Sequence, residues 1–230
     1  MIPLKDDNPT LNKPIVTYLI IGLCAGIFFI QLTSQAYKSG ELFYSYGLIP
    51  SVLMGHNQLP LDLYAVPGYI TIFTSMFMHG GFMHLIGNML YMWIFADNIE
   101  DDLGRIRFFI FYLLSGVGAA MTQVLIDTQS QVPMVGASGA IGGVLGAYLI
   151  NYPKAKVLVL IPFGFFSQLI KIKALYVLGF WFILQLISSG GGVAYAAHIG
   201  GFVSGIVLIL FFNKNKKKNI KTKITKGPWG

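Results

Sequence analysis

The sequence is poor in charge. Only 11% of its 230 residues are Asp, Glu, Lys or Arg, whereas 55% are hydrophobic and the mean hydropathy is +0.67. This balance excludes an ordinary soluble protein and predicts a polytopic membrane protein of one domain. The net charge of +7 does not indicate nucleic acid as a partner, because most basic residues lie in short stretches between apolar runs and form no common face.

Cysteine is nearly absent as well. The single cysteine, Cys24, lies within the first apolar run, which excludes a disulfide framework and a cysteine metal cluster. A cysteine in such a run is usually a small packing group. Residues 1–13 are polar and lack the short apolar core and small-residue cleavage site of a signal peptide.

The apolar runs predict an all-α fold, a bundle of six transmembrane helices. The predicted spans are Ile15 to about Gln35, Phe82 to Phe95, Ile106 to Ile126, Ser138 to Tyr152, Ala174 to Ile187 and Ala194 to Phe212. The fourth is only about 15 residues long, or roughly 22 Å against a hydrocarbon core of roughly 30 Å. Its first residue, Ser138, is therefore expected inside the membrane, and the link 127–135 is expected to dip inward.

The connecting segments differ in character. Residues 38–71 contain three prolines and several tyrosines, which indicates a structured loop at the membrane interface. Residues 153–173 are interpreted as a loop with four lysines, and residues 188–192 as a flexible link. The lysine-rich tail from Asn213 is expected to be mobile and to lie against anionic lipid.

The basic residues predict the orientation. With both termini inside, the inner segments hold 15 of the 16 Lys and Arg residues, and only Lys38 is outside. The positive-inside rule then places both termini in the cytoplasm of a cell-membrane protein. We expect a cytoplasmic segment 1–14, a six-span domain 15–212 and a basic cytoplasmic tail 213–230.

Three of these spans carry polar residues at one level, near the outer surface. Spans two, four and six run in the same direction, and their first turns hold His84 with Asn88, Ser138, and His198, respectively. Polar and ionisable residues inside a membrane are functional candidates. Small residues spaced four apart in spans four and six permit close helix packing, which would bring Ser138 to His198.

A serine beside a histidine base is a nucleophilic catalyst. None of the nine Asp and Glu residues lies within a predicted span, so the arrangement is predicted to be a Ser–His dyad rather than a triad. His84 and Asn88 could then donate hydrogen bonds to the oxyanion, together with the backbone N–H of Ser138.

Each of these residues has a structural alternative. The role could be limited to hydrogen bonding between helices for Ser138, His84 and Asn88. His79 could tie the preceding loop to span two. A metal site is disfavoured, because no H-E-x-x-H helix is present and no carboxylate or cysteine lies at that depth.

The chain resembles the rhomboid intramembrane serine proteases from about residue 15 to 212. The resemblance rests on the segment from His79 to Asn88, on Glu100, on Gly136-Ala-Ser138-Gly139, and on Ala197-His198-Ile-Gly-Gly201 with Gly205. It implies cofactor-free cleavage of transmembrane protein substrates in or beside the lipid bilayer. Ser138 would be the nucleophile, His198 the base and His84 and Asn88 the oxyanion residues. His79, Gly136, Gly139 and Gly201 would support them.

Two features depart from that resemblance. Ile70-Thr71 stand where many members have Trp-Arg, and Gly142 stands where some have a tyrosine that stacks on the base histidine.

Two other functions compete with the protease. One is a catalytically silent rhomboid-like protein that binds membrane clients, against which the presence of both Ser138 and His198 argues. The other is a small-solute transporter, disfavoured because no inverted repeat and no mid-span charge is visible.

Overall fold

The protein is a bundle of apolar helices, as predicted. The computed structural model describes the chain except residues 164–165, 189–192 and 225–230. Helices occupy all six apolar runs: α1 (Ile15–Thr33), α6 (Phe82–Leu103), α7 (Arg105–Ile126), α8 (Ser138–Asn151), α9 (Ala174–Ile187) and α10 (Tyr195–Ile224). The expectation of a polytopic helical membrane protein is confirmed.

These helices differ in length. By length and apolarity, α1, α7 and the part Tyr195–Asn213 of α10 can cross a membrane. The segment Gly68–Phe77 and α6 pass the same test as a pair bent by 80°, while α8 and α9 are shorter apolar helices. The prediction that α8 is too short to reach both surfaces therefore agrees with its 14 residues.

Two helix ends differ from the predicted ones. The acidic segment after Phe95 does not break the second span, because α6 continues to Leu103 and ends at Gly104, whose φ of +76° suits glycine. The last helix does not end at Phe212 but runs to Ile224, so the first part of the basic tail is helical. The flexible link expected at 188–192 falls largely outside the described residues, as does the last part of the tail.

Glycines allow α8 and α10 to lie backbone to backbone. A Cβ added at Gly201 would lie 1.9 Å from the Gly139 carbonyl oxygen, and one at Gly205 would lie 2.0 Å from that of Gly143. No larger residue fits these positions without moving a helix. The predicted small-residue contact is thus present, and α10 also packs along α7.

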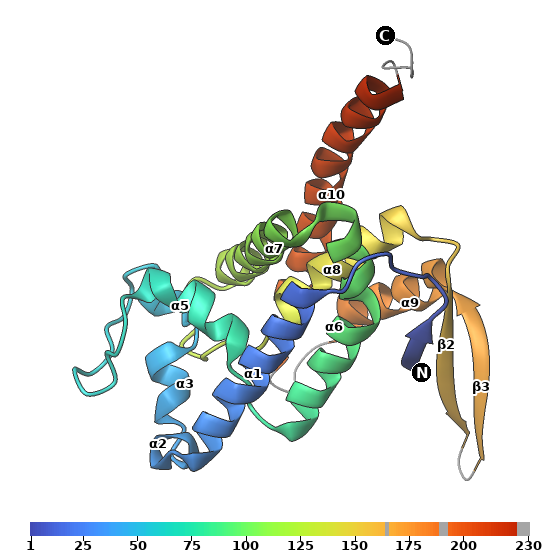
Figure 1. Ribbon diagram of the computed structural model, residues 1–230. Helices are drawn as coiled ribbons and strands as arrows, with labels where there is room; N and C mark the ends of the chain where they lie inside the picture. The colour runs from blue at the N-terminus through green and yellow to red at the C-terminus, as the bar shows by residue number, and fades with distance from the viewer. Residues whose placement is uncertain (164–165, 189–192, 225–230) are drawn as a thin grey trace.

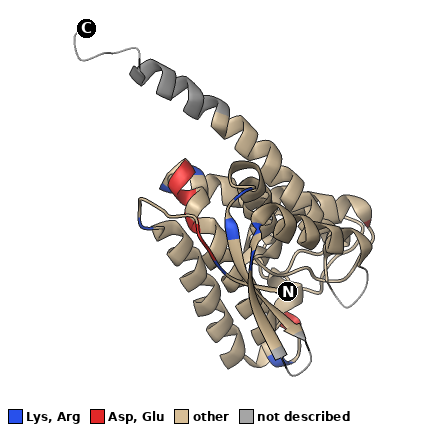
Figure 2. Cartoon of the chain, turned by 90° about the vertical axis from the view of Figure 1, so that its right-hand side faces the viewer, with Lys and Arg blue, Asp and Glu red and all other residues tan. Residues whose placement is uncertain are grey.

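One end of the bundle is held together by carboxylates, and we call it the carboxylate end (Asp6, Asp7, Glu100, Asp101 and Asp102). Buried Glu100 accepts the backbone N–H groups of Val16 at 3.0 Å and Thr17 at 2.8 Å, and also the Thr17 hydroxyl at 2.8 Å. It thereby satisfies donors in the first turn of α1, where a negative charge is favourable. Charged residues gather at the helix ends and on the strands (Figure 2).

The neighbouring carboxylates tie further segments to this end. Asp101 accepts the backbone N–H of Leu11 at 2.8 Å, and Asp102 accepts the hydroxyl of Tyr152 at 2.7 Å. The contacts join the N-terminal segment, α6 and the end of α8.

A three-stranded antiparallel sheet replaces the loop expected at 153–173. The order is β1–β2–β3, with β1 (Ile2–Asp6), β2 (Lys156–Phe163) and β3 (Phe166–Lys173). Val157 and Val159 face the core and are fully buried, whereas Lys156, Lys171 and Lys173 are exposed. The sheet lies at the edge of the bundle beside α9 (Figure 1). The apolar residues at every second position, rather than the lysines between them, therefore determine that this segment forms strands.

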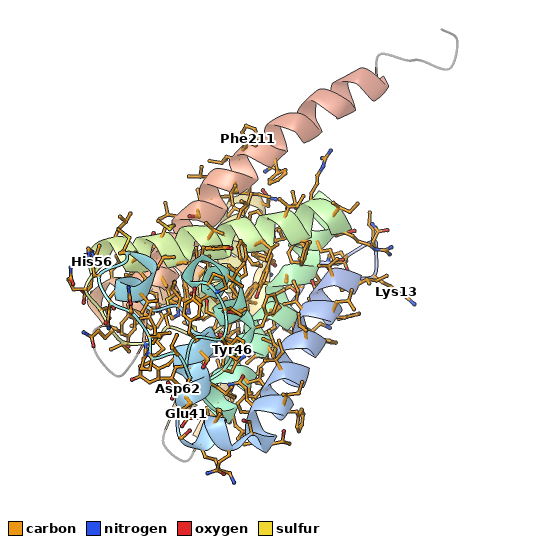
Figure 3. All side chains as sticks on the ribbon, turned by 90° about the vertical axis from the view of Figure 1, so that its left-hand side faces the viewer. Lys13, Glu41, Tyr46, His56, Asp62 and Phe211 are labelled. Atoms are coloured by element: carbon orange, nitrogen blue, oxygen red, sulfur yellow. The ribbon has the colours of Figure 1, made fainter. Side chains whose placement is uncertain are left out.

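The long connection 38–71 is structured, as predicted. It contains short helices α3 (Glu41–Tyr46) and α4 (Pro50–Leu53) and leads into α5 (Gly68–Thr74) and a 3₁₀ turn (Ser75–Phe77), while α2 (Gln35–Lys38) follows α1 directly. The Thr74 hydroxyl donates to the Tyr46 carbonyl at 2.6 Å and so anchors the connection. Figure 3 shows Glu41, Tyr46, His56 and Asp62 on this side of the molecule, away from Lys13 and Phe211.

Candidate active site

Ser138 and His198 meet at the end of the bundle opposite the carboxylates. Ser138 is the first residue of α8, and His198 lies in the first turn of α10. The Ser138 Oγ and the His198 Nε2 are 2.8 Å apart, a hydrogen-bond distance for a hydroxyl and an imidazole. The sequence placed the two residues at one level, and the glycine contact between α8 and α10 brings them together.

His84 and Asn88 lie one helical turn apart on α6 and face the segment before Ser138. A Cβ added at Gly136 would lie 2.6 Å from the His84 Nε2 and 3.6 Å from the Asn88 Nδ2. Gly136 has a φ of +127°, and its N–H donates to the Ser75 carbonyl at 2.8 Å. Only glycine suits both this backbone conformation and the close approach of the two side chains.

The Asn88 side chain carries a donor that lacks an acceptor in the part of the chain that the structure describes. Its Nδ2 is buried and has no hydrogen-bond partner among the described residues. Buried polar atoms are almost always paired, so an unpaired amide nitrogen beside a candidate nucleophile is informative. Together with the Ser138 N–H, which has no acceptor within its own helix, it could stabilise a developing oxyanion. We call this part of the bundle the serine end (Ser138, His198, His84, Asn88 and Gln185).

His79 holds the loop through its backbone rather than its ring. Its N–H donates to the Gln31 Oε1 at 3.2 Å, and its carbonyl accepts the Gln31 Nε2 at 3.2 Å, which links the end of α1 to the start of α6. The ring lies edge-on to His84 with centroids 5.2 Å apart. This arrangement supports a structural part for His79.

Two residues of α9 complete the site, and sequence reasoning missed both. The Gln185 Oε1 lies 2.7 Å from the His198 Nδ1, and the Trp181 ring packs on the imidazole with centroids 5.9 Å apart at 33°. A tyrosine at position 142 could not supply this packing, because even a Cβ there would lie 2.9 Å from the His198 carbonyl oxygen. The signal in the sequence was Gln185 itself, an amide within an apolar run.

A cavity of about 770 Å³ opens onto these side chains. Its walls include Ser138, His198, His84, Asn88 and Trp181, together with apolar residues of the surrounding helices. This volume lies within the range of cavities that bind small molecules in proteins. Within the described parts of the chain, no group of three His, Cys, Asp or Glu side chains is arranged to hold a metal ion.

Comparisons of the sequence with known proteins identify a family. The sequence model of the Rhomboid domain matches residues 67–215. Rhomboid protein 1, mitochondrial, of Saccharomyces cerevisiae is 29% identical over 172 residues, which are 71% of this chain and 48% of that protein. Rhomboid protease GluP of Bacillus subtilis is 28% identical over 194 residues, 84% of this chain and 34% of that protein. Presenilin-associated rhomboid-like protein A, mitochondrial, of Danio rerio is 35% identical over 135 residues, 57% of this chain and 34% of that protein.

The aligned regions cover only part of each relative. The chain spans about a third to a half of the length of these three proteins. All five residues of the serine end lie within the matched segment, residues 67–215.

Proposed function

The chain belongs to the rhomboid family, and from this membership we propose that it is an intramembrane serine endopeptidase that cleaves membrane proteins within or beside a transmembrane segment. The observation that carries the proposal is the 2.8 Å contact between the Ser138 Oγ and the His198 Nε2. Neither residue needs a metal or an organic cofactor for acyl transfer, because the serine is the nucleophile and the histidine the base.

The proposed reaction has two halves. His198 Nε2 accepts the hydroxyl proton while the Ser138 Oγ attacks the scissile carbonyl, and the imidazolium then gives that proton to the leaving amine. Water, activated by the same nitrogen, hydrolyses the acyl-enzyme. In both tetrahedral intermediates, the Asn88 Nδ2, the His84 side chain and the Ser138 N–H would donate to the oxyanion.

Labelling with a fluorophosphonate tests the proposal directly. The wild-type protein in detergent micelles should be modified at Ser138, as located by peptide mass spectrometry, and His198→Ala should react far more slowly. Ser115→Ala is a matched control, because Ser115 is a buried helical serine whose hydroxyl has no partner among the described residues. It should label like the wild type.

A catalytically silent rhomboid-like protein that binds membrane clients is the competing function. It shares the fold, so only reactivity separates the two. A wild-type chain that is folded but leaves the fluorophosphonate unreacted would favour this alternative over the protease.

We further propose that both termini are cytoplasmic, in a cell membrane, and that the serine end lies near the outer face. On this view, residues 1–14 and 213–230 flank a catalytic domain at 15–212. The distribution of 15 of the 16 basic residues supports this orientation.

Since the only cysteine, Cys24, is fully buried, an introduced cysteine can report sidedness. Lys38→Cys should react with an impermeant maleimide in intact cells, and Lys154→Cys should react only after lysis; the reverse pattern would overturn the orientation.

A further inference from the structure

Gln185 is placed to control the imidazole of His198. It is 9% exposed in α9, and its amide makes two hydrogen bonds. The Oε1 lies 2.7 Å from the His198 Nδ1, and the Nε2 donates to the Trp181 carbonyl at 3.0 Å. Since the second bond is to a residue of the same helix, it fixes the amide group independently of His198.

These contacts admit only one assignment of the protons. The Trp181 carbonyl can only accept, so the NH₂ group of Gln185 must face it, and the amide oxygen must then face the imidazole. An amide oxygen also only accepts, so the His198 Nδ1 must carry the proton. In the neutral ring the Nε2 then has its lone pair directed at the Ser138 hydroxyl, as a general base requires.

We propose that Gln185 is a positioning residue for the base, holding His198 in the tautomer and orientation that activate Ser138. The inference rests on the proposed protease function. The imidazole is held at Nδ1 by the amide and across its face by the Trp181 ring, so α9 limits both rotation and tilt of the ring.

A neutral amide suits this place better than the carboxylate of a triad. An ionised side chain buried between apolar helices carries a large desolvation penalty unless it is fully paired. The amide of Gln185 supplies the same acceptor geometry at Nδ1 without a charge. It orients the base without the electrostatic stabilisation of the imidazolium that a carboxylate gives.

The pH dependence of the site involves few other groups. His84 of α6 lies near enough to His198 to act on it electrostatically, and the Tyr195 ring of α10 itself lies edge-on to the imidazole at 6.3 Å. The hydrogen-bond partner of the His198 Nδ1 is the Gln185 Oε1 at 2.7 Å, so a change at residue 185 alters that partner directly.

The test compares Gln185→Leu and Gln185→Glu with Gln123→Leu. Gln123 is the matched control, because its Oε1 accepts the backbone N–H of Ala197 at 3.3 Å, one residue before His198, without touching the imidazole. The first readout is the rate of Ser138 labelling by a fluorophosphonate between about pH 5 and 9. The second is the ¹⁵N NMR spectrum of the His198 ring, assigned by its loss in His198→Ala. Thermal midpoints are measured alongside.

Gln185→Leu should slow labelling by about 10- to 10³-fold, less than the roughly 10⁴-fold loss caused by a wrong tautomer in a Ser-His-Asp triad. Its NMR spectrum should lose the pure Nδ1–H form seen in the wild type. Gln185→Glu should recover most of the rate, because it keeps an acceptor at Nδ1. Its activity should disappear at a higher pH on acidification, because a carboxylate stabilises the protonated ring. Gln123→Leu should keep the wild-type profile and tautomer.

Two results would overturn the inference. One is a Gln185→Leu protein that labels at the wild-type rate and keeps the Nδ1–H tautomer. The other is a set of Gln185 variants that melt earlier while the pH profile and tautomer do not change, since that pattern describes a packing role. A wild-type chain that never labels would refute the proposed protease instead, and the NMR comparison would still decide the role of Gln185.

Discussion

The two ends of the helix bundle use polar side chains in opposite ways. At the carboxylate end, Glu100, Asp101 and Asp102 each accept hydrogen bonds from donors on other segments. At the serine end, none of the five residues is an Asp, Glu, Lys or Arg, and the Asn88 Nδ2 has no partner among the described residues. The carboxylates of one end join separate segments of the chain, whereas the other end has, among the described residues, an unpaired donor beside a cavity.

The same helices contribute residues that stabilise the fold at one end and candidate catalytic residues at the other. α6 contributes His84 and Asn88 to one end and Glu100 to the other, while α8 contributes Ser138 and, at its far end, Asn151, which donates to Asp102 at 2.8 Å. Substitutions at the serine end should therefore change rates and leave the fold intact, and those at the carboxylate end should do the reverse.

The largest expected effect is that of Ser138→Ala. Removing the nucleophile should lower peptide cleavage on the order of 10⁶-fold, as in other serine–histidine enzymes. The thermal midpoint should stay within a few degrees, because one hydroxyl is lost. Cleavage of a transmembrane substrate by purified protein in liposomes is the measurement. If this variant cleaved substrate at the wild-type rate, the assignment of catalysis to the serine end would be wrong.

Asn88→Ala should come next. Loss of one oxyanion donor costs roughly 2.7–4 kcal/mol in the transition state, or about 10²–10³-fold in kcat, with little change in substrate binding. Because the Nδ2 has no hydrogen bond to lose within the described chain, stability should hardly change. A variant that melts much earlier, yet turns over normally in the cold, would show that Asn88 ties helices together.

Glu100→Ala should show the opposite pattern. It leaves two backbone N–H groups of α1 and the Thr17 hydroxyl without an acceptor, at about 1–3 kcal/mol for each buried donor. We expect a loss of about 3 kcal/mol in unfolding free energy, measured by denaturation in mixed micelles, and an unchanged rate per folded molecule. Exposed Glu41 provides the control, since Glu41→Ala should stay within about 0.5 kcal/mol. A cleavage defect in folded Glu100→Ala would show that the two ends are coupled.

The smallest expected effect is that of Tyr148→Phe, at about 1 kcal/mol. The Tyr148 hydroxyl donates to Asp6, and burial raises the pKa of Asp6, which this hydrogen bond partly offsets. A raised pKa means that the folded protein holds the proton more tightly than the unfolded chain, so ionising Asp6 lowers stability as the pH rises. In Tyr148→Phe the loss of stability on ionisation of Asp6 should be larger. The decrease in melting temperature relative to the wild type should therefore be greater at pH 7 than at pH 4. An equal deficit at both would exclude a contribution from the Asp6 charge.

Much of the serine end could be predicted from sequence, because its signals are local. An apolar run marks each helix, and Ser138, His198, His84 and Asn88 all stand near the starts of runs with the same direction. Because successive spans cross the membrane in alternating directions, these four residues can be placed at one level without any knowledge of how the helices pack. The family resemblance supplied their roles, and the 2.8 Å contact of Ser138 with His198 agrees with it.

Gln185 escaped prediction for a physical reason. It lies near the end of a helix that runs in the opposite direction, so no rule based on helix starts includes it. Which face of α9 meets α10 depends on packing, and the apolar residues around Gln185 do not distinguish a lipid-facing side from a packed one. A polar amide surrounded by apolar residues in a membrane helix was nevertheless a signal.

The sheet was missed because lysines and Pro162 obscured an alternating pattern. Val157, Val159, Ile170 and Ile172 form its inner face in register, with Val157 opposite Ile172 and Val159 opposite Ile170. The hairpin itself is local, but the pairing of Ile2 with Leu160 joins segments at a sequence distance that no local pattern reveals.

That pairing sets an order of events during synthesis. β1 is made before its partner β2, which follows only after roughly 150 further residues that include the apolar helices α1, α6, α7 and α8. At roughly 5–20 residues per second, the strand waits about 8–30 s for its neighbour. During this interval Ile2–Asp6 has no ladder to join, while the helices behind it are already being made. The pairing of β1 with β2 therefore cannot form until the apolar helices α1, α6, α7 and α8 have been made.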